Sequence, residues 1–242
     1  MNFKNKVIVI TGGYSGTGLV LVNEFIKLNA KVYSLDYKFS KVSKKKNLVR
    51  YGIDLSKIEE IEKFFSYLKK EEKKVDFLIN NAGRSLEYDK KNIFDYWNKT
   101  INTNLSSAFY LSNFLANLLK KSKSPAIVNI ASISSKIAMS NNQAYNCSKA
   151  GLVALTFSQA MDFKKFKIRS NCISPGYIKT AMTKKSFANK KKYAERIKRI
   201  ISNNYGESQD VAQLAIFLCG EKSKYINAEN IVIDGGLTRK GI

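Results

Sequence analysis

Histidine is absent from this chain of 242 residues, and cysteine and proline are scarce. The absence of histidine removes the commonest metal ligand and general base of proteins. The three cysteines, Cys147, Cys172 and Cys219, form neither a C-x-x-C motif nor a metal-binding spacing. We therefore expect no metal, and we expect small buried thiols of the kind that a reducing cytoplasm keeps free.

Linkers and long apolar runs are also missing. The prolines are Pro125 and Pro175, and no Pro/Gly/Ser-rich stretch divides the sequence, which favours a single domain over residues 1–242. The apolar run near the amino terminus, "KVIVIT" (6–11), is too short for a signal peptide or a membrane span. These absences predict a cytoplasmic protein with no membrane partner.

Acidic residues are few, because 19 Asp and Glu stand against 42 Lys and Arg and give a formal net charge of +23. Such a charge can attract nucleic acid. Only six of the basic residues are Arg, however, and specific recognition of bases and phosphates favours Arg. The sequence also has no recognition-helix, zinc-finger or RNA-binding motif. We expect no nucleic-acid partner and interpret the lysines as a solvated surface.

Short apolar runs alternate with longer amphipathic ones along the chain. Strands buried on both faces show near-continuous Val and Ile, and helices lie between them. This alternation predicts an α/β Rossmann fold, with a doubly wound, seven-stranded parallel sheet and helices on both faces. The expected strands are 6–11, 31–36, 48–53, 75–80, 126–131, 168–174 and 230–234, and the expected helices are 17–29, 56–73, 93–120, 145–165, 184–202 and 208–220.

The first predicted strand runs into "TGGYSGTG", Thr11 to Gly18. Glycines permit a sharp turn and a close approach to a pyrophosphate, and N–H groups of the following helix then face the anion. A tight strand–helix turn alone could explain the glycines. Their place between a strand and an amphipathic helix indicates a dinucleotide-binding turn, with contacts from Gly12, Tyr14, Ser15, Gly16, Thr17 and Gly18.

Two carboxylates follow the next predicted strands. Asp36 ends the second strand, where a carboxylate accepts hydrogen bonds from the adenosine ribose and repels a 2′-phosphate. This position predicts NAD rather than NADP as cofactor, although Lys38 nearby could accommodate a phosphate. Asp54, after the third strand, is a candidate for the adenine amino group, and a helix cap is the alternative role.

Further polar motifs also follow predicted strands, where the ligands of doubly wound sheets bind. Tyr145 and Lys149 are four residues apart and so lie next to each other on one face of a predicted helix. The chain is rich in both residue types, so chance could also produce this pair. The other members of this group are Asn81, Ala82 and Gly83 in "NNAG", Ser132 in "NIASISS", and Pro175 and Gly176 in "SPGYIKT".

Taken in order, these motifs resemble the short branch of the short-chain dehydrogenase/reductase family. The resemblance is carried by "TGGYSGTG", "NNAG", Asn104 in "NTNLSS", Ser132, "YNCSK" and "PGYIKT", closing with "IVIDGG", and extends from residue 5 to about residue 238. Each motif alone is unspecific, whereas their joint order and spacing are specific. Thr17 departs from the pattern, because the family usually has Ile or Leu between the last two glycines; we expect this to affect packing more than chemistry.

The resemblance implies an NAD(P)-dependent oxidoreductase that interconverts a secondary alcohol and a ketone by hydride transfer. Tyr145 would act as general acid/base, and Lys149 would lower its pKa and hold the nicotinamide ribose. Ser132 would orient the reacting oxygen, and Asn104 would hold a water for proton relay. The family's contacts to the nicotinamide carboxamide correspond here to Ile178 and Thr180.

A segment of about 177–206 would cover the substrate. Nine of the 21 residues from Lys179 to Arg199 are Lys or Arg, which favours a polar or anionic substrate such as a sugar or sugar nucleotide. A solvated helix face in a lysine-rich protein explains the same charges.

Three further expectations accompany this reading. A 3-oxoacyl-acyl-carrier-protein reductase is the alternative enzyme, although the family's carrier-docking arginines correspond here to Lys123 and Phe166. A sensor that binds the dinucleotide without catalysing a reaction is the alternative that is not an enzyme. The family also pairs subunits through the helices 93–120 and 145–165, so we expect a homodimer or homotetramer, with extra core packing as the rival explanation of their apolar faces.

Overall fold

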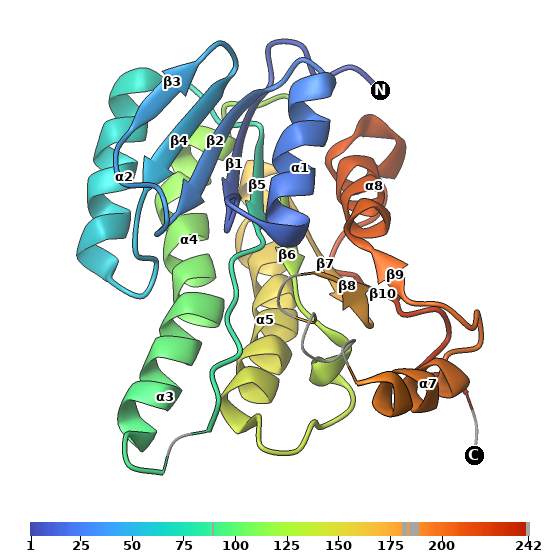
Figure 1. Cartoon of the computed structure of the whole chain (residues 1–242). Coiled ribbons are helices and arrows are strands. Elements are labelled where there is room, and N and C mark those ends of the chain that lie inside the picture. Colours follow the sequence, from blue (N-terminus) through green and yellow to red (C-terminus); the bar gives the residue numbers. More distant parts are fainter. Residues whose placement is uncertain (89, 181–182, 184–188, 241–242) are drawn as a thin grey trace.

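The computed structural model describes residues 1–88, 90–180, 183 and 189–240. At its centre is an eight-stranded sheet in the order β10-β7-β6-β5-β1-β2-β4-β3 (Figure 1). The seven predicted strands are parallel, and the chain reverses its direction across the sheet between β1 and β5. The strands are β1 (Val7–Thr11), β2 (Lys31–Asp36), β3 (Ser43–Lys45), β4 (Leu48–Gly52), β5 (Phe77–Asn80), β6 (Ala126–Ile130), β7 (Arg169–Pro175) and β10 (Asn230–Ile233).

Helices cover both faces of this sheet, as the sequence predicted (Figure 1). Short 3-10 turns occupy Ile133–Ser135, Lys164–Phe166 and Glu221–Ser223, and a small second sheet pairs β8 (Ile178–Lys179) with β9 (Gly206–Glu207). The helices are α1 (Gly16–Lys27), α2 (Ile58–Glu71), α3 (Ile93–Ile101), α4 (Ser107–Leu119), α5 (Gln143–Asp162), α7 (Lys190–Arg199) and α8 (Ser208–Cys219).

Alternation along β1 shows how the two apolar cores form. Ile8 and Ile10 join a cluster with the buried side chains of α1 and α8. Val7 and Val9 point the other way, into a cluster with α2 and α4. Successive side chains of a strand point to opposite faces, and both faces are covered here, so every residue of β1 is buried.

The structure differs from the predicted elements in several places, and one of them is the small sheet of β8 and β9, which was not predicted. β3 is an additional, antiparallel edge strand, and its exposed sequence "SKK" carries no apolar signal. The helix expected over 93–120 is divided into α3 and α4 by a π-helical turn, Asn102–Ser106. Such turns often occur at functional sites. The helix expected over 184–202 is described from Lys190 to Arg199, and residues 184–188 lie outside the described part of the chain.

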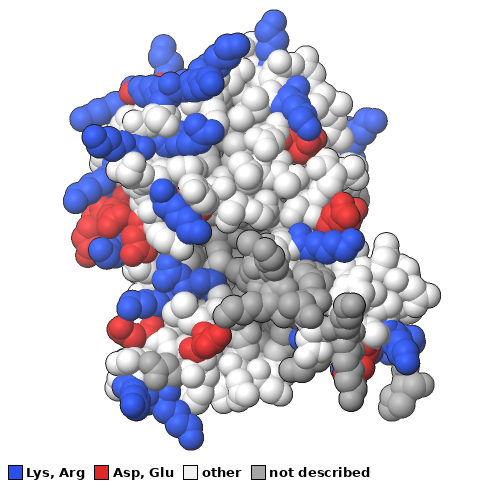
Figure 2. Space-filling model, in the orientation of Figure 1, with Lys and Arg blue, Asp and Glu red and all other residues white. Residues whose placement is uncertain are grey.

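Figure 2 shows lysine and arginine side chains in several groups over the visible face, with acidic and uncharged side chains between them. Among the helices that the structure describes, none is both long and apolar enough to cross a bilayer.

Candidate active site

A cavity of about 580 Å³ lies at the carboxyl ends of the parallel strands, on both sides of the β1–β5 reversal. This is the position at which doubly wound sheets bind ligands. Asp36 ends β2 and Ser132 follows β6, with β1 and β5 between them, so strand spacing separates the two residues by about 14 Å. The predicted residues that line the cavity are Gly12, Ser15, Gly16, Thr17, Gly18, Asp36, Asp54, Asn81, Ala82, Gly83, Ser132, Tyr145, Lys149, Pro175, Gly176, Ile178 and Thr180.

The glycine turn is built by close backbone contacts. Gly12 has a φ of 70°, a left-handed conformation that glycine adopts without strain. A Cβ on Gly18 would collide with the carbonyl oxygen of Gly12. The amide of Asn81 donates to the carbonyl oxygens of Thr11 (2.9 Å) and Gly12 (3.3 Å) and so joins the turn to the loop after β5.

The helix that follows this turn presents an open amino terminus. Ser15, its N-cap residue, makes no side-chain capping hydrogen bond, and the first turn of α1 contains no acidic residue. By contrast, Glu207 and Asp210 form a capping box at the start of the neighbouring helix α8. Gly16 and Thr17, the first two residues of α1, line the cavity, and the N–H groups of a helix start form an anion site that fits a pyrophosphate. Thr17, the departure from the family pattern, lies 3.2 Å (Oγ1) from Ser208 Oγ and links these two helix ends.

Asp36 is oriented by backbone groups. Its Oδ2 accepts the N–H of Tyr14 (3.2 Å) and its Oδ1 accepts the N–H of Lys38 (3.0 Å). Tyr14 does not line the cavity, because its ring packs on Phe39 with 5.5 Å between ring centroids and is 45% exposed. Tyr14 thus acts on Asp36 through its backbone.

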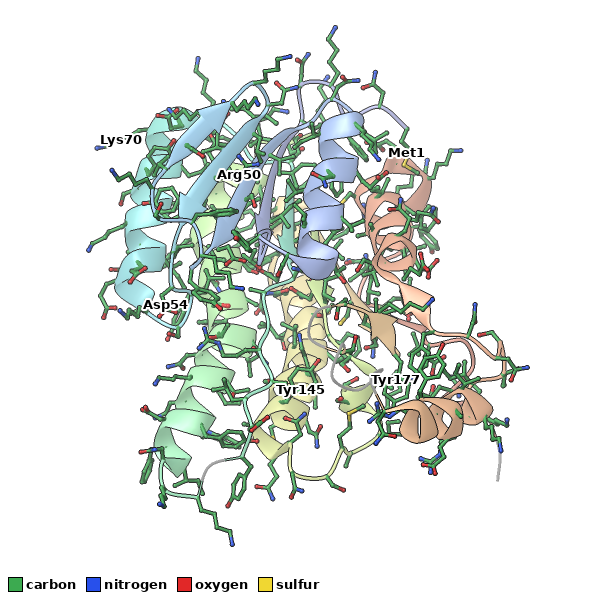
Figure 3. All side chains as sticks on the ribbon, viewed as in Figure 1. Met1, Arg50, Asp54, Lys70, Tyr145 and Tyr177 are labelled. Carbon is green, nitrogen blue, oxygen red and sulfur yellow. The ribbon has the colours of Figure 1, made fainter. Side chains whose placement is uncertain are left out.

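Asp54 lines the cavity on the far side of Asp36 and is not the N-cap of α2, a position that Lys57 occupies. Its Oδ1 accepts the backbone N–H (3.0 Å) and the hydroxyl (2.7 Å) of Ser56. Burial raises the pKa of Asp54, but these hydrogen bonds and the charge of Arg84 outweigh burial and leave the pKa lowered. Figure 3 shows Asp54 and Tyr145 on separate elements, Asp54 next to α2 and Tyr145 on α5.

Ser132, Tyr145 and Lys149 come together on one wall of the cavity. Lys149 is 3% exposed, and its ammonium donates to the carbonyl oxygen of Ile130 (2.7 Å). The same nitrogen lies 5.7 Å from the centroid of the Tyr145 ring. Ser132 is buried, and its Oγ accepts the N–H of Ser134 (3.1 Å).

Burial is the largest cause of the pKa shifts of Lys149 and Tyr145. It lowers the pKa of Lys149 to about 8, because the charged amine loses its hydration. Within the described residues, no carboxylate lies at salt-bridge distance from Lys149. Burial also raises the pKa of the Tyr145 phenol, and the Ser132 hydrogen bond offsets this only in part. Among the described residues, burial thus leaves the pKa of Tyr145 raised, and a lowering of it by Lys149 together with the cofactor remains a prediction.

Asn104 lies behind the cavity wall rather than on it. It is 1% exposed within the π-helical turn, and its Oδ1 accepts the N–H of Arg84 (2.8 Å). Its Nδ2 donates to the carbonyl oxygen of Arg84 (2.9 Å) and to Ser148 Oγ (3.0 Å). The side chain thus ties the loop after β5 to α5, and a role in holding a water remains a prediction.

The sequence motifs did not predict several of the residues that line the cavity. Arg84 directly follows "NNAG" and Tyr37 directly follows Asp36, so their position beside recognised motifs was the available signal. Thr103 precedes Asn104 and offered no such pattern. Lys38, which the sequence analysis named as a possible phosphate partner, also lines the cavity, and the other unpredicted lining residues are Ile53, Leu55, Ser85, Leu86, Ile130, Ala131 and Thr183.

The part of the chain that the structure describes holds no group of three or more His, Cys, Asp and Glu side chains that could bind a metal ion. The donor groups of the cavity fit an elongated anion with hydroxyl groups instead. An open helix terminus lies near the middle, a carboxylate at one end, and a tyrosine–lysine pair at the other.

Comparisons with known proteins agree with this geometry. A family model described as enoyl-(acyl carrier protein) reductase matches residues 14–238. An NAD-dependent glycerol dehydrogenase of Listeria innocua is 34% identical over 99% of this chain and 96% of its own length. The chain belongs to the short-chain dehydrogenase/reductase family.

Two other relatives extend the comparison. A 3-oxoacyl-acyl-carrier-protein reductase of Chlamydia pneumoniae is 32% identical over 96% of this chain and 97% of its own. A solved structure titled 4-hydroxyisoleucine dehydrogenase complexed with NADH superposes with a TM-score of 0.92, at 34% identity, over 98% of this chain and 100% of that one. The chain is thus an oxidoreductase of this family that uses a nicotinamide dinucleotide and acts on a small molecule.

Proposed function

We propose that this enzyme interconverts a secondary alcohol and a ketone with NAD as cofactor, with Tyr145 as the proton donor and acceptor. The observation that carries the proposal is the convergence of Ser132, Tyr145 and Lys149 on a cavity whose other walls are the glycine turn and Asp36. A dinucleotide sensor without turnover needs the glycine turn but not this buried set.

The chain's own residues account for the proton transfer. During reduction, the Tyr145 hydroxyl gives its proton to the carbonyl oxygen of the substrate, and during oxidation the phenolate takes a proton from the alcohol. Ser132 donates a hydrogen bond to the same oxygen and orients it. Lys149, with a pKa of about 8, is largely protonated at pH 7, so its charge can stabilise the phenolate. When bound, the nicotinamide dinucleotide supplies or accepts the hydride, and its oxidised ring adds a positive charge near Tyr145.

The preference for NAD over NADP rests on Asp36. Asp36 is 9% exposed and lines the cavity, and two backbone N–H groups orient its carboxylate, so it is set to accept hydrogen bonds from ribose hydroxyls. A 2′-phosphate at this position would meet a negative charge in a partly desolvated site.

A polar or anionic substrate remains the proposal for the molecule that Tyr145 acts on. The support is the basic composition of the segment 179–199, of which residues 181–182 and 184–188 lie outside the described residues. The relative named glycerol dehydrogenase favours a small polyol, and the relative named 3-oxoacyl-acyl-carrier-protein reductase keeps an acyl thioester as the second candidate.

An NAD(H)-linked activity screen tests the proposal. The panel holds polyols, sugar acids, hydroxy acids, sugar nucleotides and 3-oxoacyl thioesters, each assayed with NADH or NAD and with NADPH or NADP. We expect turnover with a hydroxylated substrate and the NAD pair. NADH binding without turnover on any class would support the sensor, and turnover with 3-oxoacyl thioesters alone would support the second candidate.

We further propose that α4 and α5 pair two subunits into a homodimer or homotetramer. Phe109, Phe157 and Met161 are 47%, 41% and 73% exposed on these helices. Leu118, Leu152 and Phe163, further apolar residues of the segments 93–120 and 145–165, are buried in the core of the chain itself and do not support the pairing. Light scattering should give at least twice the monomer mass, and a Met161→Lys/Phe157→Lys variant should reduce it. A monomeric wild-type protein would contradict the pairing.

A further inference from the structure

A second serine hydroxyl lies behind Ser132, in the short 3-10 turn Ile133–Ser135. The Ser132 hydroxyl donates to Ser134 Oγ (3.2 Å), and Ser132 Oγ accepts the backbone N–H of Ser134 (3.1 Å). Ser132 lines the cavity, whereas Ser134 is 4% exposed and is not part of the lining. Ser134 is therefore in a position to act on the cavity through Ser132.

Backbone hydrogen bonds hold Ser132 in place for this contact. Ser132 is the N-cap residue of the turn, and the N–H of Ser134 makes the capping bond to its side chain. The carbonyl oxygen of Ser132 accepts the N–H (3.0 Å) and the hydroxyl (2.7 Å) of Ser135. Each of these three bonds has a fixed direction, because an N–H cannot accept and a carbonyl cannot donate. The bond between the two hydroxyls of Ser132 and Ser134 can reverse, because each hydroxyl can donate or accept.

The proposed reaction requires this reversal. A hydroxyl has one proton, and in the unliganded chain the Ser132 proton points to Ser134. The Ser132 hydroxyl also hydrogen-bonds to Tyr145, so it faces the point at which the oxygen of the substrate reacts. When Ser132 donates to that oxygen, its proton turns away from Ser134. Ser132 Oγ then has a second lone pair to fill, and the Ser134 hydroxyl lies 3.2 Å from it.

We propose that Ser134 is a positioning residue for the reaction, whose hydroxyl donates to Ser132 Oγ in the substrate complex and so holds the Ser132 proton on the reacting oxygen. The inference rests on the proposed function, in which Ser132 donates to that oxygen. A hydroxyl that accepts a hydrogen bond is a stronger donor, because linked hydrogen bonds polarise one another. The gain is larger in the transition state than in the bound substrate, because negative charge develops on the oxygen.

A double-mutant cycle tests this role, with NADH and the carbonyl compound of the activity screen that gives the highest kcat. Ser134→Ala removes the hydroxyl and keeps the backbone N–H that caps the turn. We expect kcat to fall about tenfold, with KM and the affinity for NADH within about twofold of wild type. In a Ser132→Ala background the same substitution should change kcat by less than about twofold, because the residue through which Ser134 acts is then absent.

Two further variants make the test independent of the fold. Ser135→Ala is the matched control, because it removes a hydroxyl of the same turn that bonds to the Ser132 carbonyl rather than to its Oγ. Its kcat should stay within about twofold of wild type. Ser134→Cys replaces the hydroxyl with a weaker donor and should give a smaller loss of kcat than Ser134→Ala. Circular dichroism shows that each variant is folded before the assay.

Wild-type kcat in Ser134→Ala would overturn the proposal. A tenfold loss on adding Ser134→Ala to Ser132→Ala would also overturn it, because Ser134 would then act through another group. A tenfold loss in Ser135→Ala would do the same, because the effect would then belong to the turn as a whole. Wild-type kcat in Ser132→Ala, or no turnover by the wild type, would instead remove the proposed function, so the two failures are distinguishable.

Discussion

Each end of the central sheet contains a buried charged group, but the two groups differ in their hydrogen-bond partners. At the amino end, Asp76 is 0% exposed and accepts hydrogen bonds from the backbone N–H of Val7 (2.9 Å), the Ser122 hydroxyl (2.6 Å) and the amines of Lys6 (3.2 Å) and Lys74 (2.8 Å). At the carboxyl end, Lys149 is 3% exposed and donates to one neutral carbonyl.

The pKa values follow from this difference. Burial raises the pKa of Asp76, but its four donors outweigh burial and the pKa is lowered. Burial lowers the pKa of Lys149 to about 8, and no carboxylate restores it among the described residues. A compensated buried charge stabilises the fold, whereas an uncompensated one can respond to a ligand. We infer that the amino end serves stability and the carboxyl end serves catalysis.

The largest expected effect is on catalysis. Tyr145→Phe removes the transferable proton and keeps the ring, so kcat should fall on the order of 10³-fold while the affinity for NADH stays within about twofold. Steady-state kinetics on the substrate found by the screen, with calorimetry for NADH, measures both. Near-wild-type kcat in this variant would refute the proposed role of Tyr145.

At the other end of the sheet, Asp76→Asn should lower the free energy of unfolding by about 3 kcal/mol, because Lys6 and Lys74 lose their buried partner. The folded-state pKa of Asp76 is lowered, so its stabilisation is present above the unfolded pKa and is lost as the pH falls through the folded value. Urea titrations measure the change. If the folded variant also lost affinity for NADH, the inference that the amino end serves stability and the carboxyl end serves catalysis would be wrong.

Lys149 should also make stability rise with pH, but in a more alkaline window, because here the charged form is the one that burial destabilises. Its folded-state pKa is about 8 against an ordinary value of 10.5, so the unfolded chain binds more protons between these values and stability rises with pH across that window. The rise attributable to Lys149 should be on the order of 3 kcal/mol. Urea titrations at several pH values give the free energy of unfolding of the wild type and of Lys149→Met, and the difference between the two isolates the contribution of Lys149. A difference that does not change from pH 8 to 10.5 would contradict an uncompensated charge.

The smallest effect concerns cofactor choice. Asp36→Ala should weaken NADH by about tenfold to a hundredfold, because hydrogen bonds to a charged acceptor are lost, and should raise the affinity for NADPH relative to NADH. Competition titrations with both cofactors give the ratio. An unchanged ratio would show that Asp36 does not select NAD.

Local patterns predicted the sheet and much of the cavity, because several motifs directly follow a strand and parallel strands end at one edge. The glycine turn, Asp36 and Ser132 lie where that rule puts them, whereas Tyr145 and Lys149 line the cavity from helix α5. β3 was missed because its three residues are polar and its pairing with β4 depends on a hairpin rather than on burial.

Contacts between segments that are distant along the chain could not be predicted from the sequence. The approach of Arg84 to Tyr37 joins loops that follow different strands, and the hydrogen bonds of Asn104 to Arg84 join a π-helical turn to the loop after β5. Nothing local in the chain encodes these contacts. The division of the helix 93–120 was missed for a related reason. Its apolar pattern is compatible with a continuous helix, and the π-helical turn at Asn102–Ser106 shows only in the backbone.

Titration of NADH into the wild-type chain, Asp76→Asn and Asp36→Ala at pH 7 tests the central claim, that the carboxyl end of the sheet alone forms the dinucleotide site. The account predicts one NADH per chain in the wild type, the same affinity in folded Asp76→Asn, and at least tenfold weaker binding in Asp36→Ala. Absence of binding in the wild type, or an equal loss in both variants, would contradict it.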